Sequence, residues 1–287
     1  MKAKEIAIKD LCQLTDADLF KEVSEGLDLI IDHTSQVEKD AKFLAEHKKK
    51  CGLNILKDII KEEAAKFLIL LDAIRCPRVP PEKFAKQLQR FNDHLAKGIY
   101  SLVYNTRPAH FKEIHELVVS ECHEYYLDGP NDVDWIFRNE ILRKREEHIY
   151  VDYIESNGDH FWLTPKQYYH PDISPIIFYA TPKILEVAYA LWKIGCTKAD
   201  SLSIIAEQWR TVEISDDSSW QELRKLNHHT LEKLASKNLI IEQPDSVHST
   251  IIDNWLFPLH SLDIRIIEVH KSHLKKIRDK ASFKMYY

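Results

Sequence analysis

Glycine is scarce in this sequence, with 6 glycines and 11 prolines among 287 residues. Sandwiches and barrels use these residues in their many tight turns, so their scarcity disfavours such folds. Leucine, isoleucine, lysine and glutamate are abundant, and 30% of the residues are charged. These residue types favour helices, so the composition predicts an all-α protein with a sizeable core.

Cysteines are few and widely separated: Cys12, Cys51, Cys76, Cys122 and Cys196. Their odd number and spacing indicate neither a disulfide framework nor a CxxC metal site. No apolar run approaches the roughly 20 residues of a membrane span, and the charged first residues contain no signal-peptide core. We therefore expect a cytoplasmic protein with no membrane partner.

Several common catalytic motifs are missing from the sequence. It contains no GxxxxGK[ST], GxGxxG or GxSxG pattern, so nucleoside triphosphate hydrolysis, hydride transfer and acyl transfer lack support. Its histidine pairs do not form the HExxH or paired CxxC patterns of zinc sites. We predict neither a metal nor a cofactor. The net charge of −5 disfavours nonspecific coating of nucleic acid, but it leaves room for a confined basic site.

Apolar residues recur at helical spacing through most of the chain. Helices are predicted over residues 16–49, 53–75, 82–104, 111–122, 133–148, 183–194, 198–211, 217–237 and 262–280, with a break at Cys51-Gly52 and a loop over 127–132. Short runs at 149–154 and 160–163 flank Asn157-Gly158, which predicts a small β-hairpin after the fifth helix. A proline-rich stretch over 165–182 places a boundary between a helical domain at 1–170 and a C-terminal helical extension at 171–287.

The most charged stretch is Arg143 to His148, at the predicted end of the fifth helix. A guanidinium that grips a phosphate beside an imidazole that moves a proton suits cleavage of RNA. On a straight helix Arg145 and His148 share a face, whereas Arg143 and His148 do not. Either Arg145 is the partner of His148, or the helix ends before it. The alternative is an ordinary solvated helix end, with His148 favoured there by the helix dipole.

Two further clusters lie upstream. Glu62, Glu63 and Lys66 stand at ion-pair spacing, which a surface pair explains and a buried pair that orients an active-site group also fits. Arg90, His94 and Lys97 would share one stripe of the third predicted helix. That stripe is either an anion-binding strip or an ordinary helix surface.

Aromatic residues follow the predicted hairpin. Trp162, Tyr168 and Tyr169 could stack on bases. The alternative is that they pack the hairpin onto a helix. The cations between His270 and Lys280 would make the last predicted helix basic.

Three stretches resemble, in content and order, the AbiV-like abortive infection proteins of the HEPN superfamily. They are Lys61-Glu62-Glu63-Ala64-Ala65-Lys66, Phe91-Asn92-Asp93-His94-Leu95-Ala96-Lys97 and Arg145-Glu146-Glu147-His148-Ile149-Tyr150-Val151-Asp152, the last followed by a turn, Trp162 and Pro165. The resemblance covers about residues 16–170. The C-terminal extension inherits nothing from it.

The resemblance implies a HEPN-like helical bundle that forms a homodimer and cleaves RNA without a metal. It implies an abortive-infection effector that arrests growth or translation, with a phage-encoded protein as a possible trigger. In that superfamily an arginine and a histidine a few residues apart supply the chemistry, and Arg143 and His148 have this spacing. The candidate catalytic residues are therefore His94, Arg143, Arg145 and His148, and the supporting residues are Glu62, Glu63, Lys66, Arg90, Lys97, Glu146, Tyr150 and Asp152.

One position departs from the family pattern. The family does not reliably place a histidine at the position of His148, whereas Glu63, Lys66, His94, Lys97 and Arg145 fit its pattern better. Whether His94 or His148 carries the proton is left open. Two non-catalytic functions also remain: a dimeric interaction module that binds a phage protein or RNA, and an RNA-binding adaptor.

Overall fold

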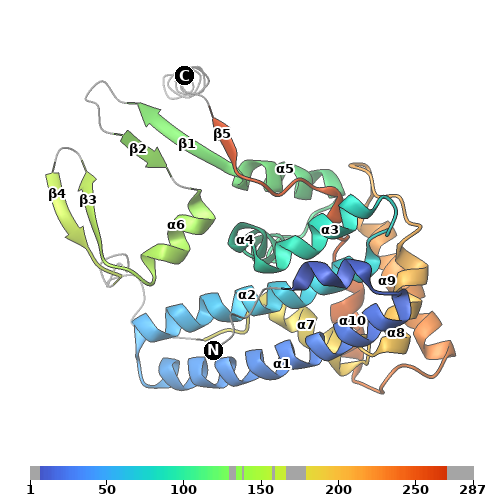
Figure 1. The fold of residues 1–287 in the computed structure, drawn as a ribbon. Coiled ribbons are helices and arrows are strands. Elements are labelled where there is room, and N and C mark those ends of the chain that lie inside the picture. The colour runs from blue at the N-terminus through green and yellow to red at the C-terminus, as the bar shows by residue number, and fades with distance from the viewer. Residues whose placement is uncertain (1–6, 129–133, 138, 157–158, 166–178, 270–287) are drawn as a thin grey trace.

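The computed structural model describes residues 7–128, 134–137, 139–156, 159–165 and 179–269. This part of the chain is mostly helical, as the composition predicts (Figure 1). None of its helices combines the length and apolar character that crossing a membrane requires. The helices are α1 (Asp16–Glu46), α2 (Lys50–Arg75), α3 (Pro81–Gln89), α4 (His94–Val103), α5 (Phe111–Glu121), α6 (Glu140–Glu147), α7 (Lys183–Lys193), α8 (Ala199–Trp209), α9 (Trp220–Ser236) and α10 (Asp245–Asn254), with short 3-10 turns η1 (Ile8–Gln13), η2 (Arg90–Asn92) and η3 (Leu259–Ser261).

The long helices α1 and α2 pack side by side, and residues from both helices enter the core. Thr15 begins α1 because its side chain accepts a hydrogen bond from the backbone N–H of Asp18. The predicted break at Cys51-Gly52 is wrong, since both residues lie inside α2. The chain turns instead at Lys48, whose φ of 55° is left-handed, and the Lys48 and Lys49 N–H groups bond back to α1 carbonyls.

The single helix predicted over 82–104 is divided in the structure. Helix α3 ends at Gln89, η2 follows, and α4 begins at His94. Asp93 causes the division, because its backbone is extended and its carboxylate accepts hydrogen bonds from the N–H groups of Leu95 and Ala96. His94 therefore begins a helix and does not lie in the middle of one.

The helix predicted over 133–148 is also shorter in the structure. Residues Asp134–Phe137 form strand β2, which pairs antiparallel with β1 (His123–Asp128), where part of a loop was predicted. Their run Trp135-Ile136-Phe137 has the aromatic and β-branched residues that strands favour. Asn139 then caps α6, accepting hydrogen bonds from the N–H groups of Ile141 and Leu142.

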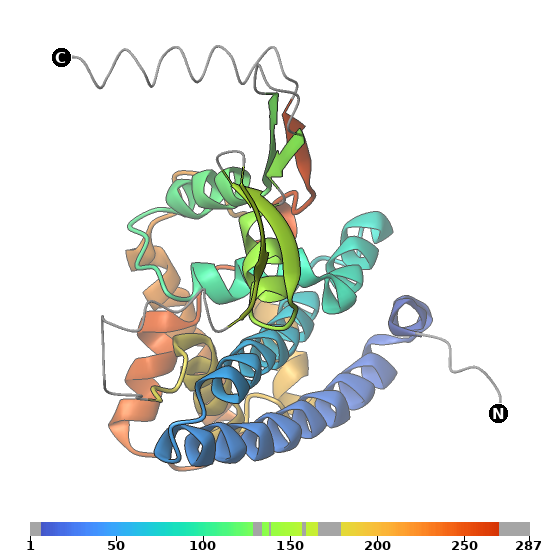
Figure 2. The ribbon, with the colours of Figure 1, turned by 90° about the vertical axis from the view of Figure 1, so that its left-hand side faces the viewer.

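The strands form two small sheets. β1 is the central strand of one, between antiparallel β2 and parallel β5 (Ile267–Val269). The predicted hairpin is confirmed as β3 (Asp152–Ser156) and β4 (Asp159–Leu163), while its turn at 157–158 lies outside the described residues. Figure 2 shows this hairpin on the same side of the molecule as α6.

Beyond the proline-rich stretch, three of the predicted helices are confirmed as α7, α8 and α9. Helix α10 was missed by the sequence analysis. The helix predicted over 262–280 is wrong at 267–269, which form β5, and residues 270–287 lie outside the described residues, as do Tyr168 and Tyr169.

The helices on both sides of the predicted domain boundary share one hydrophobic core. Arg75 of α2 lies over the rings of both Trp209 and Trp255 and donates a 2.7 Å hydrogen bond to the carbonyl of Leu256. On α1, buried Glu38 accepts hydrogen bonds from Tyr179, Thr181 and Tyr189. The C-terminal helices therefore complete the core around α1 and α2.

Candidate functional site

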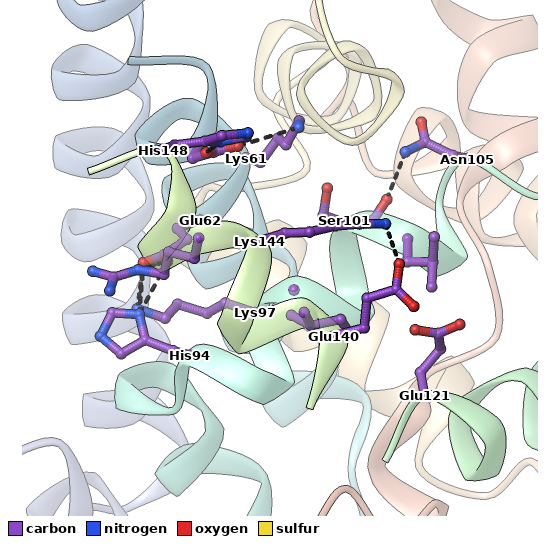
Figure 3. Close-up of a pocket in the computed structure, with 15 residues that line it drawn as sticks. Lys61, Glu62, His94, Lys97, Ser101, Asn105, Glu121, Glu140, Lys144 and His148 are labelled. Carbon is purple, nitrogen blue, oxygen red and sulfur yellow. Dashed lines mark hydrogen bonds and ion pairs between the residues drawn. The ribbon is translucent and has the colours of Figure 1, made fainter. Parts of the chain in front are cut away.

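Helices α2, α4 and α6 enclose a pocket of about 290 Å³ that opens to solvent (Figure 3). Three candidate catalytic residues, His94, Arg145 and His148, line this one pocket. Its complete lining is Asp58, Lys61, Glu62, His94, Lys97, Gly98, Ser101, Leu102, Asn105, Glu121, Glu140, Ile141, Lys144, Arg145 and His148.

Glu62 of α2 is the centre of the polar contacts in the pocket. Its carboxylate accepts hydrogen bonds from His94 Nδ1 at 3.0 Å, from Lys97 Nζ at 2.8 Å and from Arg145 Nε at 2.8 Å. Burial alone would raise the pKa of Glu62, but the hydrogen bonds and charges of Lys97 and His94 hold that pKa below its usual value. Glu62 therefore stays ionised and acts only as an acceptor.

Helix α4 supplies His94 and Lys97 from its first turn. The Asp93 cap fixes where that turn begins, so His94 and Lys97 stand three residues apart and both reach Glu62. Lys97 is 4% exposed, and its ammonium would be buried without a partner if Glu62 were neutral. His94 lines the same pocket and is 42% exposed to solvent.

Helix α6 packs unusually close to α4 because of Gly98. A Cβ at position 98 would lie 2.1 Å from Cγ2 of Ile141, so only glycine permits this approach. The Asn139 side chain also holds the start of α6, donating to the backbone carbonyl of Glu121. These contacts direct Arg145 and His148 of the α6 end toward α2.

Arg145 of α6 and His148, the residue that caps α6, meet two carboxylates one turn apart on α2. Arg145 bonds Glu62, and His148 Nδ1 forms a short hydrogen bond with Asp58. Helix α6 ends at Glu147 but His148 keeps helical dihedral angles as its cap, so Arg145 and His148 remain on one side. Arg145, and not Arg143, is therefore the arginine that shares the pocket with His148.

The contacts to Glu62 also determine which nitrogen atoms of His94 and Arg145 are left without a partner among the described residues. Because the ionised carboxylate can only accept, Nδ1 of His94 carries the proton, and Nε2 of a neutral ring is then a proton acceptor. Within the described part of the chain, neither Nε2 of His94 nor the terminal nitrogens of Arg145 have a hydrogen-bond partner. The Glu62 carboxylate thus holds a proton acceptor, the His94 imidazole, beside a planar hydrogen-bond donor, the Arg145 guanidinium.

The remaining predicted residues of α6 and the hairpin lie elsewhere. Arg143 forms an ion pair with Glu147 and does not line the pocket. Tyr150 and Asp152 are exposed beyond the end of α6, and Glu146 is partly buried but outside the pocket lining.

Three of the predicted residues on α2 and before α4 also lie outside the pocket lining. Glu63 pairs with Lys66 at 2.6 Å, and Lys66 lies over the Phe91 ring, outside the pocket. Arg90 is buried and donates to the backbone carbonyls of Leu259 and Leu262. The predicted strip of Arg90, His94 and Lys97 does not form, because the chain changes direction at Asp93 between them.

Sequence analysis missed Asp58, Lys61, Glu140 and Lys144 in this pocket. Asp58 precedes Glu62 by one helical turn, and that spacing was the available signal. Each lysine or arginine that lines the pocket has a carboxylate partner among the described residues, at 3.4 Å for Lys61 with Asp58 and 2.5 Å for Lys144 with Glu140. Among the described residues no group of His, Cys, Asp and Glu is arranged to hold a metal ion.

No protein-family model, no curated protein and no solved structure matches this chain.

Proposed function

We propose that this protein is a HEPN-type ribonuclease of the AbiV-like kind that cleaves RNA in the pocket around Glu62. The observation that carries the proposal is the shared carboxylate. Glu62 holds the His94 imidazole and the Arg145 guanidinium together at a solvent-open pocket, and Glu62 does not occupy Nε2 of His94 or the terminal nitrogens of Arg145. An imidazole beside a guanidinium is suited to transfer of a phosphodiester bond.

In this mechanism Nε2 of His94 accepts the proton of a ribose 2′-hydroxyl. The 2′-oxygen attacks the adjacent phosphorus, the bond to the 5′-oxygen breaks, and that oxygen takes a proton from the second imidazole, His148. The products are a 2′,3′-cyclic phosphate and a 5′-hydroxyl end. Arg145 donates to the phosphate oxygens as their charge grows. Glu62 and Asp58 position the two rings and are not themselves consumed.

A non-catalytic interaction module is the second candidate, and one observation favours it. Each lysine and arginine of the pocket is already paired with a carboxylate, as in a structural ion-pair network. Such a module would bind a phage protein or RNA as a homodimer without cutting it. The two candidates differ in whether RNA is broken.

Cleavage of labelled RNA by the purified protein tests the proposal. We expect wild-type protein to cut RNA in the presence of EDTA, and His94→Ala and His148→Ala each to lower the rate by about 10²–10⁴-fold, as for loss of a general acid or base. His33→Ala is the matched control, because His33 is exposed on α1 and does not line the pocket. Equal cutting by all four proteins, or by none, contradicts the catalytic assignment.

The cellular part of the proposal is abortive infection. The enzyme would act in the cytoplasm as a homodimer, stopping growth or translation when a phage-encoded trigger is present. Plaque counts on cells that express wild-type or His94→Ala protein test this part. Equal protection by both proteins would favour the non-catalytic module.

A further inference from the structure

The hairpin that follows the pocket exposes an unusual amount of aromatic surface. Trp162 is 64% exposed and Tyr153 is 58% exposed, although both rings belong to a strand pair. A two-stranded hairpin buries little apolar area and is marginally stable by itself. Large exposed aromatic groups on such an element indicate a surface that binds something.

The rings form a continuous strip on one face of the hairpin. Tyr153 and Trp162 are cross-strand partners with ring centroids 5.0 Å apart, and the His160 ring lies 6.0 Å from Tyr153. Because neighbouring residues of a strand point to opposite faces, Phe161 lies on the other face. The hairpin register places the exposed carboxylates Asp152 and Asp159 on that other face too. Asp152 and Asp159 thus face away from the strip, whereas Glu155, the register partner of His160, occupies a position on the same face as the strip.

The strip is also close to the pocket along the chain. Trp162 pairs with Tyr153, and Tyr153 follows the pocket residue His148 by five residues, a stretch that spans at most about 18 Å when extended. Tyr150, at 55% exposure, lies between them. Figure 2 places the hairpin and α6 on the same side of the molecule. A polymer held in the pocket could therefore reach the strip.

We infer that this aromatic strip, defined by Tyr153, His160 and Trp162, binds unpaired bases of single-stranded RNA next to the pocket. The inference rests on the proposed function and adds how the substrate is selected. Exposed rings in a row stack on successive bases irrespective of base identity, and only unpaired bases can present their faces to them.

Binding of a non-cleavable oligonucleotide by the full-length protein tests the inference. The probe is a fluorescein-labelled single-stranded RNA carrying 2′-O-methyl groups, compared with the same sequence as a duplex. We expect Trp162→Val and Tyr153→Val each to weaken single-strand binding by about 5- to 150-fold, which corresponds to the stacking energy per base, and to change duplex binding little. Valine keeps the β-propensity of each strand position.

Phe161→Val is the matched control on the opposite face of the same strand, and we expect it to bind the single strand like wild type. Equal weakening by Phe161→Val would assign the effect to hairpin folding and overturn the inference. Unchanged binding by Trp162→Val, with a shift of its monomer–dimer equilibrium in sedimentation, would assign the strip to a second copy of the chain and also overturn it. If wild-type protein cuts RNA but Trp162→Val binds the single strand normally, this inference fails and the proposed function stands. If wild-type protein does not cut RNA, the proposed function fails.

Discussion

At the scale of single residues, Glu62 organises the site more than either histidine does. It accepts hydrogen bonds from His94, Lys97 and Arg145, which come from two other helices. A carboxylate in this position fixes which nitrogen of His94 carries the proton and where the guanidinium of Arg145 lies. In the proposed mechanism Glu62 positions these groups and does not take the proton of the substrate.

Glu62→Gln should therefore affect both stability and cleavage. Because Lys97 is almost fully buried, loss of its ionised partner should lower the free energy of unfolding by about 1–3 kcal/mol. Urea unfolding at pH 7 measures this loss. Glu63→Gln is the matched control one residue along the helix. Its partner Lys66 lies outside the pocket and is 23% exposed, so this change should lower the free energy of unfolding by less than about 1 kcal/mol. Equal losses for the two variants would contradict the central role of Glu62.

The depressed pKa of Glu62 gives this prediction a pH dependence. A carboxyl whose pKa is lower in the folded state contributes stability above its unfolded pKa of about 4.3, and the contribution disappears as the pH falls through the folded-state pKa. The difference in unfolding free energy between wild type and Glu62→Gln should therefore shrink when the pH is lowered from 7 to 3. A difference that is constant with pH would show that the charge of Glu62 is not its cause.

At the scale of elements, the pocket depends on how closely α6 approaches α4. Gly98→Ala would place a methyl group 2.1 Å from Ile141 Cγ2, so α6 must shift away from its present position. We expect loss of RNA cleavage together with destabilisation by about 1–3 kcal/mol, as for overpacking of a core. Thermal unfolding and the cleavage assay measure the two effects.

The control for this change is Gly26→Ala on α1. A Cβ there would lie 3.8 Å from Leu70, an ordinary contact, so helix propensity should make the variant neutral or more stable by about 0.5–1 kcal/mol. The second change Ile141→Ala should partly restore cleavage to Gly98→Ala, because it removes the clashing methyl group. If Gly98→Ala cleaves like wild type, the close approach of the helices is not required.

Some of the helices and strands could be predicted from the sequence and others could not. Strong apolar periodicity was sufficient to predict α1 to within a few residues at its end. The division of 82–104 was missed because apolar spacing continues across Asp93, and a cap residue inside a periodic pattern was not recognised. Strand β5 was missed because its partner β1 lies far away in the sequence, so no local pattern predicts their pairing. Strands β1 and β2 pair with each other and are close in sequence, but part of β1 was predicted as a loop and β2 as the start of a helix.

The site was only partly predictable for the same reason. Charge clustering identified Glu62, His94, Lys97, Arg145 and His148, and the structure brings them to one pocket. Arg143 and Arg90 carried equally strong local signals. Arg143 lies outside the pocket because another side of α6 faces α2, and Arg90 lies outside it because the chain changes direction at Asp93. Both are consequences of tertiary packing.

At the scale of the whole molecule, one polar network joins the helices of the pocket to the C-terminal part. Buried Asp72 of α2 accepts hydrogen bonds from Tyr100 of α4 at 2.6 Å and from the backbone N–H of Leu259 at 2.9 Å. Arg75 forms a buried ion pair with the same Asp72 and lies over the rings of Trp209 and Trp255. The C-terminal part therefore helps to hold the helix that carries His94.

Shared packing of this kind predicts a single unfolding transition for the whole protein. Trp255→Ala should lower the free energy of unfolding by about 3–5 kcal/mol, since Trp255 is fully buried, and should lower the stability of both parts together. Calorimetry and hydrogen exchange measure this. Two separate transitions, with residues 1–170 unaffected by the substitution, would instead support the independent domain boundary that the sequence predicts.

The chemical nature of the RNA ends is the most direct test of the central claim, that Glu62, His94 and Arg145 together cleave RNA through its 2′-hydroxyl. The measurement is end-group analysis of a synthetic RNA after incubation with wild-type protein, beside the same RNA with 2′-deoxy sugars at the cleaved positions. The account predicts 2′,3′-cyclic phosphate and 5′-hydroxyl ends, no cutting at the deoxy positions, and loss of cutting in both His94→Ala and Glu62→Gln. Ends with a 5′-phosphate, or cutting that persists at deoxy positions, would contradict it.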